Sequence, residues 1–398
     1  PHAAAWRTGR MRRRRSALVG LLLVVLGTSP AAAGVHDLDG DGLRNSFENQ
    51  HGVTSPTNPD TDGDGVVDSA EDNDGDRLSN KGEQKFGLHP GRRDSDGDGR
   101  PDGKVDADRD RRSNAVEQDH RPVPAGLTPE LWQAIGDVSP YKAGCQTTAG
   151  KSNVVTCSYG RQASPTTVVL MGDSHAMQLA TPIVTVAEEN GWHLTTLVKK
   201  ACPPVLGIHN NAQKWADDGK SCRKWRWNAL AWLNQNPPDH IILAHSDNYG
   251  ISTFAGERIS TKDRPAVWKS GMKRTIAQMP QSSNVIVFGD IPLNKVNPVG
   301  CLQRNKKNIS KCVTSRKPLY KRKIELAIEQ AAKNKGATFR RFFNKICTYD
   351  PCPVIQGDVM IYRDKGHLTA TFTRQLTPTF RKMLTPLIGT APAGKKKK

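Results

Sequence analysis

Val168-Val169-Leu170-Met171-Gly172-Asp173-Ser174-His175 is the stretch that decides the fold of this 398-residue chain. Four apolar residues are followed by Gly-Asp-Ser and an amphipathic segment, a pattern that predicts a buried strand ending in a strand-to-helix turn. In a parallel α/β sheet, ligands bind in the crevice outside the carboxyl ends of the strands. Such a turn presents Ser174 to a substrate rather than to the core.

Strand-like and helix-like runs alternate on both sides of this stretch. We expect strands over residues 168–171, 193–198, 241–244, 285–288 and 338–342, and helices over 175–190, 222–236, 266–278 and 318–335. This alternation predicts βαβ units and a parallel sheet covered on both faces. The expected fold class is therefore α/β, a three-layer α/β/α domain.

Near the other end of the chain lies Asp364-Lys365-Gly366-His367. A serine nucleophile needs a base and a carboxylate that orients the base. The spacing lets one loop supply both, with Asp364 accepting the Nδ1 proton of His367 while Nε2 faces Ser174. An α/β-hydrolase would place its serine in Gly-x-Ser-x-Gly and its acid and base on different loops. Residues 172–176 do not fit that pentapeptide.

Charge divides the chain into two parts. Residues 37–119 hold 22 Asp or Glu against 11 Lys or Arg, whereas residues 120–398 hold 17 acids against 41 bases. An acidic arm thus precedes a strongly basic body, which predicts an anionic partner.

Residues 11–33 have the parts of a secretory signal peptide: a basic start, an apolar run and the small residues Ala31-Ala32-Ala33. The apolar run is about half the ~20 residues that a membrane-spanning helix needs. We therefore expect cleavage and a secreted or envelope-associated, extracytoplasmic protein. Export argues against nucleic acid as the anionic partner and favours anionic wall polymers or lipid head groups.

Eight cysteines follow, all in the basic body. In an oxidising compartment an even number of cysteines predicts a disulfide framework. Neighbours in sequence give the pairs Cys145–Cys157, Cys202–Cys222, Cys301–Cys312 and Cys347–Cys352.

The acidic arm contains Asp-x-Asp-x-Asp triplets that recur at 34 or 35 residues. Calcium loops place oxygen ligands at positions 1, 3, 5, 7, 9 and 12, with Gly at position 6. Two loops fit this pattern, with side-chain ligands Asp37, Asp39, Asp41, Asn45 and Glu48, and Asp60, Asp62, Asp64, Asp68 and Glu71. The Leu43 carbonyl supplies position 7 of the first loop.

Three further loops depart from the pattern at one position each. Their ligands are Asp72, Asp74, Asp76, Asn80 and Glu83; Asp94, Asp96, Asp98 and Asp102; and Asp106, Asp108, Asp110, Asn114 and Glu117. Arg77 and Arg111 replace Gly at position 6, and Val105 stands at position 12 of the fourth loop. An acidic disordered linker is the alternative. Acidic residues that only keep a linker soluble, however, would not need to recur at the ligand positions of a calcium loop.

The arm, residues 34–120, resembles thrombospondin type 3 repeats, including the lead-in Thr57-Asn58-Pro59-Asp60-Thr61-Asp62. The resemblance implies a stalk with little regular structure and little hydrophobic interior, stiffened by structural calcium. A Pro-rich linker or packed lead-in follows at 121–140, then the body at 141–388. A basic tail ends the sequence at 389–398.

The body resembles the SGNH hydrolase superfamily, and most closely the SGNH domain fused to acyltransferase-3 proteins. The matching blocks, over about 141–387, are Gly172-Asp173-Ser174-His175, Cys202-Pro203-Pro204, Gly289-Asp290-Ile291-Pro292, the Cys301 and Cys312 pair, and Tyr362-Arg363-Asp364 with His367-Leu368-Thr369. This implies a flavodoxin-like fold that hydrolyses or transfers O-linked acyl groups, commonly acetyl, on envelope carbohydrate. By resemblance, the catalytic residues are Ser174, His367 and Asp364.

The oxyanion hole departs from that family. We find no clear Gly-x-Asn-Asp block, so the backbone amide of Ser174 is the first expected donor, with Asn248 or Ser246 as a second. No cofactor is expected for catalysis. His175, His240 and His245 are expected to be structural.

Two hypotheses follow. The first is a secreted serine esterase or O-acyltransferase acting on O-acyl groups of cell-envelope or extracellular carbohydrate, with an anionic or acylated envelope polysaccharide as partner. The acyl group would come from the substrate or from another protein, such as a separate membrane acyl donor. The second is a non-catalytic, calcium-dependent adhesin or polysaccharide-binding protein on the same fold.

Overall fold

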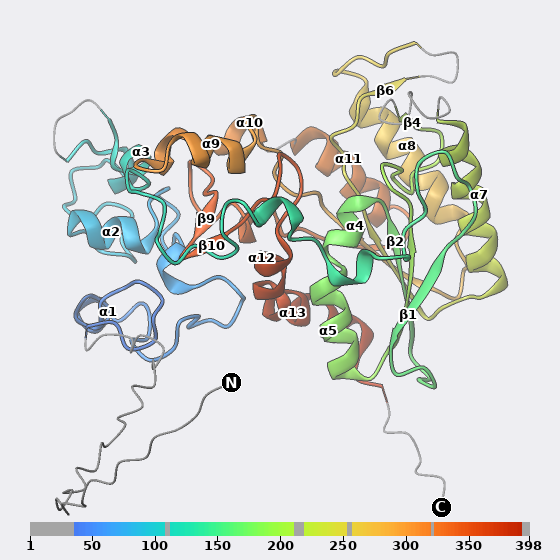
Figure 1. Cartoon of the computed structure of the whole chain (residues 1–398), viewed down its shortest axis with the longest axis horizontal. Coiled ribbons are helices and arrows are strands. Elements are labelled where there is room, and N and C mark those ends of the chain that lie inside the picture. Colours follow the sequence, from blue (N-terminus) through green and yellow to red (C-terminus); the bar gives the residue numbers. More distant parts are fainter. Residues whose placement is uncertain (1–35, 108–111, 211–218, 253–256, 320–321, 392–398) are drawn as a thin grey trace, which may run out of the picture.

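The computed structural model describes residues 36–107, 112–210, 219–252, 257–319 and 322–391 (Figure 1). The expected signal peptide at 11–33 and most of the basic tail lie outside these residues. Among the described helices, none combines the length and the apolar character needed to cross a membrane.

A central sheet carries the body. Its strands are β1 (Thr156–Gly160), β2 (Thr167–Gly172), β3 (His193–Val198), β5 (His240–Ala244), β7 (Asn284–Phe288) and β8 (Thr338–Arg340), in the order β1-β3-β2-β5-β7-β8. All neighbours pair in parallel except β1, which is antiparallel to β3. Without β1, the order is that of flavodoxin-like sheets. From β2 the chain first adds β3 on one side of the sheet and then returns to add β5 on the other side. A ligand crevice is expected at such a switch point, between the carboxyl ends of β2 and β5.

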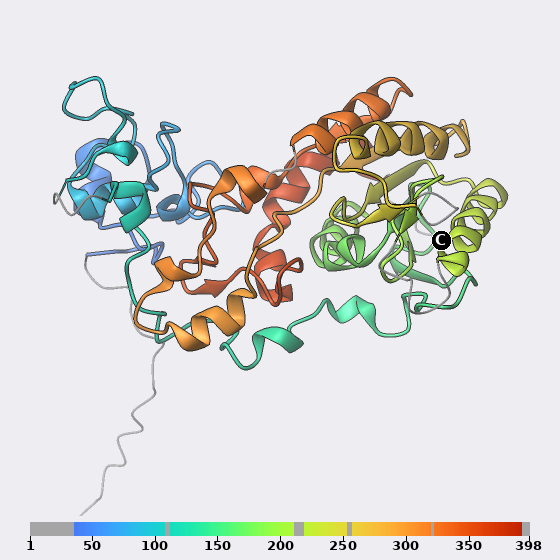
Figure 2. The same ribbon diagram turned by 90° about the horizontal axis from the view of Figure 1, so that it is seen from above.

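Both faces of the sheet are covered. Side chains alternate along each buried strand, so Val168 and Leu170 of β2 face one hydrophobic cluster and Val169 and Met171 face the other. The first cluster packs against α4 (Ser174–Gln178), α5 (Ala180–Asn190), α12 (Ala370–Gln375) and α13 (Thr377–Ile388). The second packs against α7 (Lys220–Gln235), α8 (Arg264–Ala277) and α11 (Arg322–Lys333). Figures 1 and 2 show α7 and α5 on opposite sides of the sheet.

The predicted α/β/α fold is therefore confirmed, with two differences. The helix expected at 175–190 is two helices, α4 and α5, and that expected at 318–335 is α10 (Arg316–Leu319) and α11. β1 was not expected from the sequence. Nor were two short antiparallel pairs, β4 (His209–Asn210) with β6 (Ile251–Ser252) and β9 (Ile355–Gln356) with β10 (Val359–Met360). α9 spans Pro298–Arg304.

The four predicted disulfides are confirmed. The bonded pairs are Cys145–Cys157, Cys202–Cys222, Cys301–Cys312 and Cys347–Cys352. Cys202 and Cys222 tie the segment after β3 to α7. Each bridge closes a short loop of the body, where it restricts the unfolded chain.

The acidic arm contains short helices separated by loops: α1 (Asn45–His51), η1 (Asp68–Ala70), α2 (Asn80–Phe86), η2 (Asp102–Lys104) and α3 (Asn114–Glu117). Its buried apolar side chains are few: Leu43, Phe47, Val66, Ala70, Leu78 and Ala115. Buried carboxylates and amides lie among them, including Asp68, Asn80 and Glu83. This agrees with the expected small hydrophobic interior.

The expectation of a stalk needs one correction, because the arm is docked on the body. Lys345 pairs with Asp64, and the Thr379 hydroxyl donates to the Asp64 carbonyl oxygen. The Tyr349 hydroxyl lies 3.2 Å from Oδ1 of the buried Asp119. Figures 1 and 2 show the arm beside the orange and red segments of the body.

Residues 121–140 pack as a lead-in along the body, as Figure 2 shows. Leu127 and Ala134 belong to the first hydrophobic cluster. The amide of Val123 donates to the Lys306 carbonyl oxygen at 2.8 Å, and that of Thr128 donates to the Asp358 carbonyl oxygen at 2.7 Å. The sequence left open whether residues 121–140 form a linker or a packed lead-in, and in the structure they pack against the body.

Candidate active site

Ser174 is the first residue of α4, directly after the turn that ends β2. Asp173 occupies the N-cap, and its carboxylate accepts a hydrogen bond from the amide of His175 at 2.8 Å. Asp is a favoured N-cap residue because its side chain accepts from an amide of the first turn that has no helical partner. The turn places the Ser174 side chain at the carboxyl edge of the sheet.

Ser174, His367 and Asp364 come together across this edge. The Nε2 atom of His367 lies 3.0 Å from the Ser174 hydroxyl oxygen. Its Nδ1 atom lies 2.9 Å from Oδ2 and 3.0 Å from Oδ1 of Asp364. The fold thus brings Ser174 together with Asp364 and His367, which are distant from it in the sequence. Nε2 of His367 faces Ser174 and Nδ1 faces Asp364, as we expected.

The His367 loop is held from several sides. The amides of Gly366 and His367 each donate to Oδ1 of Asp364 at 2.8 Å. The amide of Leu368 donates at 2.7 Å to the side-chain oxygen of Gln178, on α4. Helix α4 therefore carries the serine and also anchors the loop that carries its base.

The pKa values of His367 and Asp364 suit a neutral base beside an ionised carboxylate. Burial lowers the pKa of His367, assisted by the charges of His175 and Arg363. Burial raises the pKa of Asp364, but the hydrogen bond and charge of His367 outweigh it, and the net pKa is about 2. At neutral pH, His367 can accept a proton and Asp364 can stabilise the resulting imidazolium.

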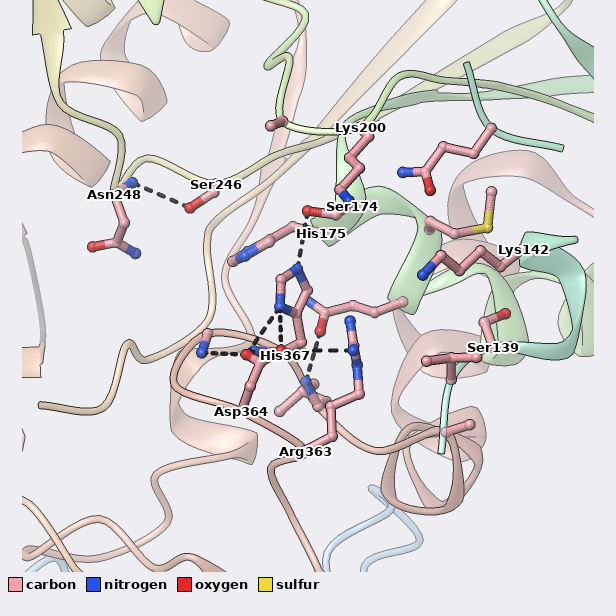
Figure 3. Close-up of a pocket in the computed structure, with 18 of the residues that line it drawn as sticks. Ser139, Lys142, Ser174, His175, Lys200, Ser246, Asn248, Arg363, Asp364 and His367 are labelled. Carbon is pink, nitrogen blue, oxygen red and sulfur yellow. Dashed lines mark hydrogen bonds and ion pairs between the residues drawn. The ribbon is translucent and has the colours of Figure 1, made fainter. Parts of the chain in front are cut away.

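A pocket of about 500 Å³ opens over Ser174 (Figure 3). Its lining includes His175, Asp364 and His367 and also the segment around Ser139. Ala201, another lining residue, has a φ of 53°, in the left-handed region that L-residues with a side chain seldom occupy. The pocket lies at the crevice that the strand order predicts.

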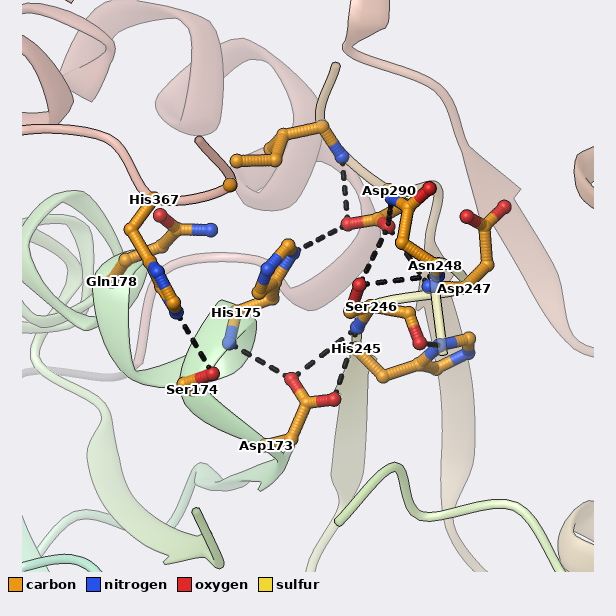
Figure 4. Close-up of polar contacts among 12 residues, drawn as sticks. Asp173, Ser174, His175, Gln178, His245, Ser246, Asp247, Asn248, Asp290 and His367 are labelled. Carbon is orange, nitrogen blue, oxygen red and sulfur yellow. Dashed lines mark hydrogen bonds and ion pairs between the residues drawn. The ribbon is translucent and has the colours of Figure 1, made fainter. Parts of the chain in front are cut away.

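The two candidate oxyanion donors reach this pocket, but their side chains point to Asp290 (Figure 4). The Ser246 hydroxyl and the Asn248 side-chain amide donate to Oδ2 of Asp290 at 3.1 and 2.9 Å. The amide of Asp247 donates to the same oxygen at 2.8 Å. The role of Ser246 and Asn248 as donors to an oxyanion stays a prediction.

His175 forms a buried ion pair with Asp290, with 2.6 Å between Nδ1 and Oδ1. Burial lowers the pKa of His175, but the charge and hydrogen bond of Asp290 outweigh it and raise the pKa to about 9. The same pairing lowers the pKa of Asp290 against the effect of its burial. The expected structural role of His175 fits this pair, which joins the segment after β7 to helix α4.

Asp173 is a second buried carboxylate under the site. It accepts a hydrogen bond from the Tyr249 hydroxyl at 2.9 Å and from the Ser246 amide at 3.1 Å. Burial and the charge of Asp173 raise the pKa of Tyr249 well above its usual value, so Tyr249 keeps its proton as a donor. Asp173 and Asp290 together fix the loop after β5.

Tyr249, Gln178 and the hydrogen bonds between Asp290 and the loop after β5 were not expected from the sequence. Asp290 could have been found, because it follows the strand at 284–288 as Ser174 follows the strand at 167–172. Tyr249 and Gln178 carry no such signal, since their partners lie far away in the sequence.

The arm repeats one loop geometry in its described residues. In the first four predicted calcium loops, the amide at position 6 donates to Oδ2 of the position 1 aspartate: Gly42 to Asp37, Gly65 to Asp60, Arg77 to Asp72, and Gly99 to Asp94. A helix begins at position 9 of every loop, at Asn45, Asp68, Asn80, Asp102 and Asn114. Arg77 has a φ of 89°, close to the 90° of Gly65, so the loop keeps its shape without Gly.

The donor set of these loops fits calcium. One carboxylate oxygen from each aspartate of a triplet lies within 4.8 Å of the others in the loops that start at Asp37, Asp60, Asp72 and Asp94. In the third loop, both side-chain oxygens of Glu83 and the Oδ1 atom of Asn80 are buried without a hydrogen-bond partner. Buried oxygens of this kind are costly unless a cation or donor satisfies them. Asp108 and Asp110, in the fifth loop, lie outside the described residues.

Three solved structures resemble the chain. The periplasmic domain of a lipopolysaccharide acetyltransferase from Salmonella ser. Paratyphi A has 15% identity and a TM-score of 0.45, with 65% of this chain and 97% of that chain covered. A carbohydrate acetylesterase from Sinorhizobium meliloti has 14% identity and a TM-score of 0.32, with 56% and 99% covered. A putative GDSL-like lipase from Parabacteroides merdae has 9% identity and a TM-score of 0.33, with 58% and 97% covered.

No functionally curated protein matches the chain. The family model described as the SGNH domain fused to AT3 domains matches residues 144–382, which is more than half of the chain. This match covers the central sheet, the Ser174 turn and the loop of Asp364 and His367. The chain therefore belongs to the family of SGNH domains fused to AT3 domains.

Proposed function

We propose that the protein is a serine esterase or O-acyltransferase that acts on O-acyl groups, principally acetyl, of envelope or extracellular carbohydrate. The observation that carries this proposal is the 3.0 Å distance between His367 Nε2 and the Ser174 hydroxyl oxygen at the pocket. A serine with a base at this distance, itself oriented by a carboxylate, is the arrangement required for covalent acyl transfer.

In the proposed reaction, the Ser174 oxygen attacks the acyl carbonyl carbon while His367 Nε2 takes the hydroxyl proton. Asp364 stabilises the imidazolium through Nδ1. Collapse of the tetrahedral intermediate breaks the bond to the sugar oxygen, which leaves with the proton from His367. Water or another sugar hydroxyl then attacks the acyl-enzyme and gives its proton to His367. Collapse of the second tetrahedral intermediate breaks the bond to the Ser174 oxygen, which takes that proton back from His367.

Replacing Ser174 by Ala tests this mechanism. Ser174→Ala removes the nucleophile, so hydrolysis of p-nitrophenyl acetate should fall by about a thousandfold or more. Ser260→Ala is the matched control, because Ser260 is exposed and does not line the pocket. Circular dichroism of both variants should match that of the wild type. Full activity of folded Ser174→Ala would contradict the mechanism.

A fluorophosphonate probe separates the enzyme from the adhesin hypothesis. The probe should label wild-type Ser174, identified by peptide mass, and leave Ser174→Ala unmodified. A folded wild-type protein that hydrolyses no ester and takes up no probe would favour the binding protein instead.

The setting that we propose is extracytoplasmic. Four disulfides in the described body support an oxidising compartment. The proposed partners are an acylated or anionic envelope polysaccharide and, for transfer, a separate membrane protein that donates the acyl group. Release of free acetate from envelope fractions by wild type, but not by Ser174→Ala, would indicate hydrolysis. Incorporation of acetate into the polysaccharide would indicate transfer.

We also propose that the arm binds calcium as a structural ion. In the third loop, Asp72, Asp74, Asp76, Asn80 and Glu83 would hold it. The ion would neutralise carboxylates that otherwise repel one another and would satisfy buried oxygens. The docked arm would then be rigid, while catalysis needs no metal.

Calorimetry tests the calcium proposal without measuring activity. Titration of calcium into chelated protein should give heat of binding and raise the Tm of the arm. Glu83→Gln should remove or weaken one site, whereas Glu188→Gln, on an exposed position of α5, should not. Identical titrations for wild type and Glu83→Gln would contradict the assignment of this loop.

A further inference from the structure

Three cationic side chains line the pocket that contains Ser174: Lys142, Lys200 and Arg363. They come from separate parts of the chain. Lys142 ends the 3-10 helix Pro140–Lys142, Lys200 follows β3, and Arg363 precedes Asp364. Figure 3 shows the three side chains around the same open region beside Ser174 and His367.

Among its described residues, the pocket lining holds more cationic side chains than acidic ones. Asp364 is the acidic residue among the described residues of the lining, and its carboxylate binds His367. Arg363 Nη1 lies 3.6 Å from Oδ2 of the same carboxylate, which His367 and Arg363 therefore share. Asp137, near Arg363, accepts the amide of Thr371 at 2.9 Å. His175 adds a further positive charge, but Asp290 neutralises it.

The cations are close enough to influence one another. Burial lowers the pKa of Lys142, and the charges of Arg363 and Lys200 lower it further, against the attraction of Asp364. Like charges gathered at a concave surface raise the local concentration of an anion and bind it more strongly than the same charges in open solvent. The site is therefore complementary to a negative group placed beside the ester.

We propose that the acylated sugar, or the sugar next to it, carries a carboxylate or phosphate that binds Lys142, Lys200 and Arg363. This inference rests on the proposed esterase or transferase function and gives it a substrate class, an acidic polysaccharide. The general positive charge of the body attracts any polyanion, whereas these three residues select an anion at a fixed place relative to Ser174.

Two esters that differ mainly in charge test the inference. 4-Acetoxybenzoate carries a carboxylate, and its methyl ester does not, while the acetyl group to be removed is the same. The measured quantity is the ratio of kcat/KM for the anionic ester to that for the neutral ester. Because the intrinsic reactivity of each ester is constant, it cancels when this ratio is compared between the wild type and a variant.

The test variant is Lys142→Gln with Lys200→Gln, which keeps side-chain length and removes two charges. The ratio should fall by about tenfold, mainly through KM of the anionic ester, with the neutral ester within about twofold of wild type. Arg363 is left intact because it contacts Asp364. Lys306→Gln with Lys307→Gln is the matched control, because these lysines lie outside the pocket lining.

The outcomes separate the two proposals. An unchanged ratio in Lys142→Gln with Lys200→Gln, or an equal fall for both esters, would overturn the anion site. Wild-type protein that hydrolyses neither ester would instead contradict the proposed function. Inhibition of neutral-ester hydrolysis by free benzoate or by inorganic phosphate, weaker in the double variant, shows which anion the site prefers.

Discussion

The buried pair of His175 and Asp290 makes a quantitative prediction about stability. Nδ1 of His175 lies 2.6 Å from Oδ1 of Asp290, and the two side chains are 8% and 6% exposed. Its partners Ser246, Asp247 and Asn248 lie on the loop after β5 (Figure 4). Replacing His175 by Gln keeps a polar side chain of similar size but removes the positive charge.

The magnitude follows from linkage between protonation and folding. The folded pKa of His175 is about 9, against 6.5 for an unperturbed histidine. A difference of this size corresponds to about 3 kcal/mol of stability. Because the folded pKa is the higher one, this contribution is fully present below pH 6.5 and is lost as the pH rises through 9. At about pH 8, roughly half of it remains.

The assay is urea unfolding followed by tryptophan fluorescence, which reports on the buried Trp192, Trp225 and Trp268. Wild type, His175→Gln and a control, His120→Gln at an exposed position, are compared at about pH 6, 8 and 9.5. The destabilisation by His175→Gln should be about 3 kcal/mol smaller at the highest pH than at the lowest. Titrating groups whose pKa values do not depend on His175 cancel in the comparison with wild type. A destabilisation that is the same at all three pH values would refute a charged His175 in the folded protein.

Three more predictions concern the framework of the site. Gly172→Ala should destabilise the protein by about 1–3 kcal/mol or more, measured by thermal unfolding, because its Cβ would overlap the Ala244 carbonyl oxygen on β5. Asp364→Asn should lower kcat about 10³–10⁴-fold and move the acid limb of the pH–rate profile to lower pH, because Asp364 raises the pKa of His367. The wild-type limb should lie below pH 6.5, because burial lowers the pKa of His367. Replacing both Cys202 and Cys222 by Ala should cost about 3 kcal/mol in urea unfolding.

The sheet could be predicted because its strands are buried on both faces. In β2, β5 and β7, nearly every side chain is buried, so each strand appears in the sequence as a continuous apolar run. The edge strand β1 (Thr156–Gly160) has side chains that are exposed or half-buried, and its sequence gives no such run. Its antiparallel pairing with β3 depends on the tertiary structure.

The site was predictable where local chemistry defines it. Gly-Asp-Ser marks a strand-to-helix turn, and Asp364 reaches His367 within one loop, where it also accepts the loop amides. The loop after β5 is different, because its geometry is set by Asp173 and Asp290, which lie 73 and 44 residues from Ser246. A sequence pattern cannot specify such contacts before the strand order is known.

This difference bears directly on the oxyanion hole. Asp290 draws the side-chain donors of Ser246 and Asn248 toward itself, and turning the Asn248 amide over would set its oxygen against a carboxylate. The charge of Asp290 therefore binds both side chains in this structure, while His175, the residue after Ser174, balances that charge. The pair joins two elements that border the pocket, and the backbone amide of Ser174 stays the first expected oxyanion donor, because the turn itself provides it. We propose that the oxyanion hole relies first on this backbone amide, and such a hole would not require an Asn block at that position.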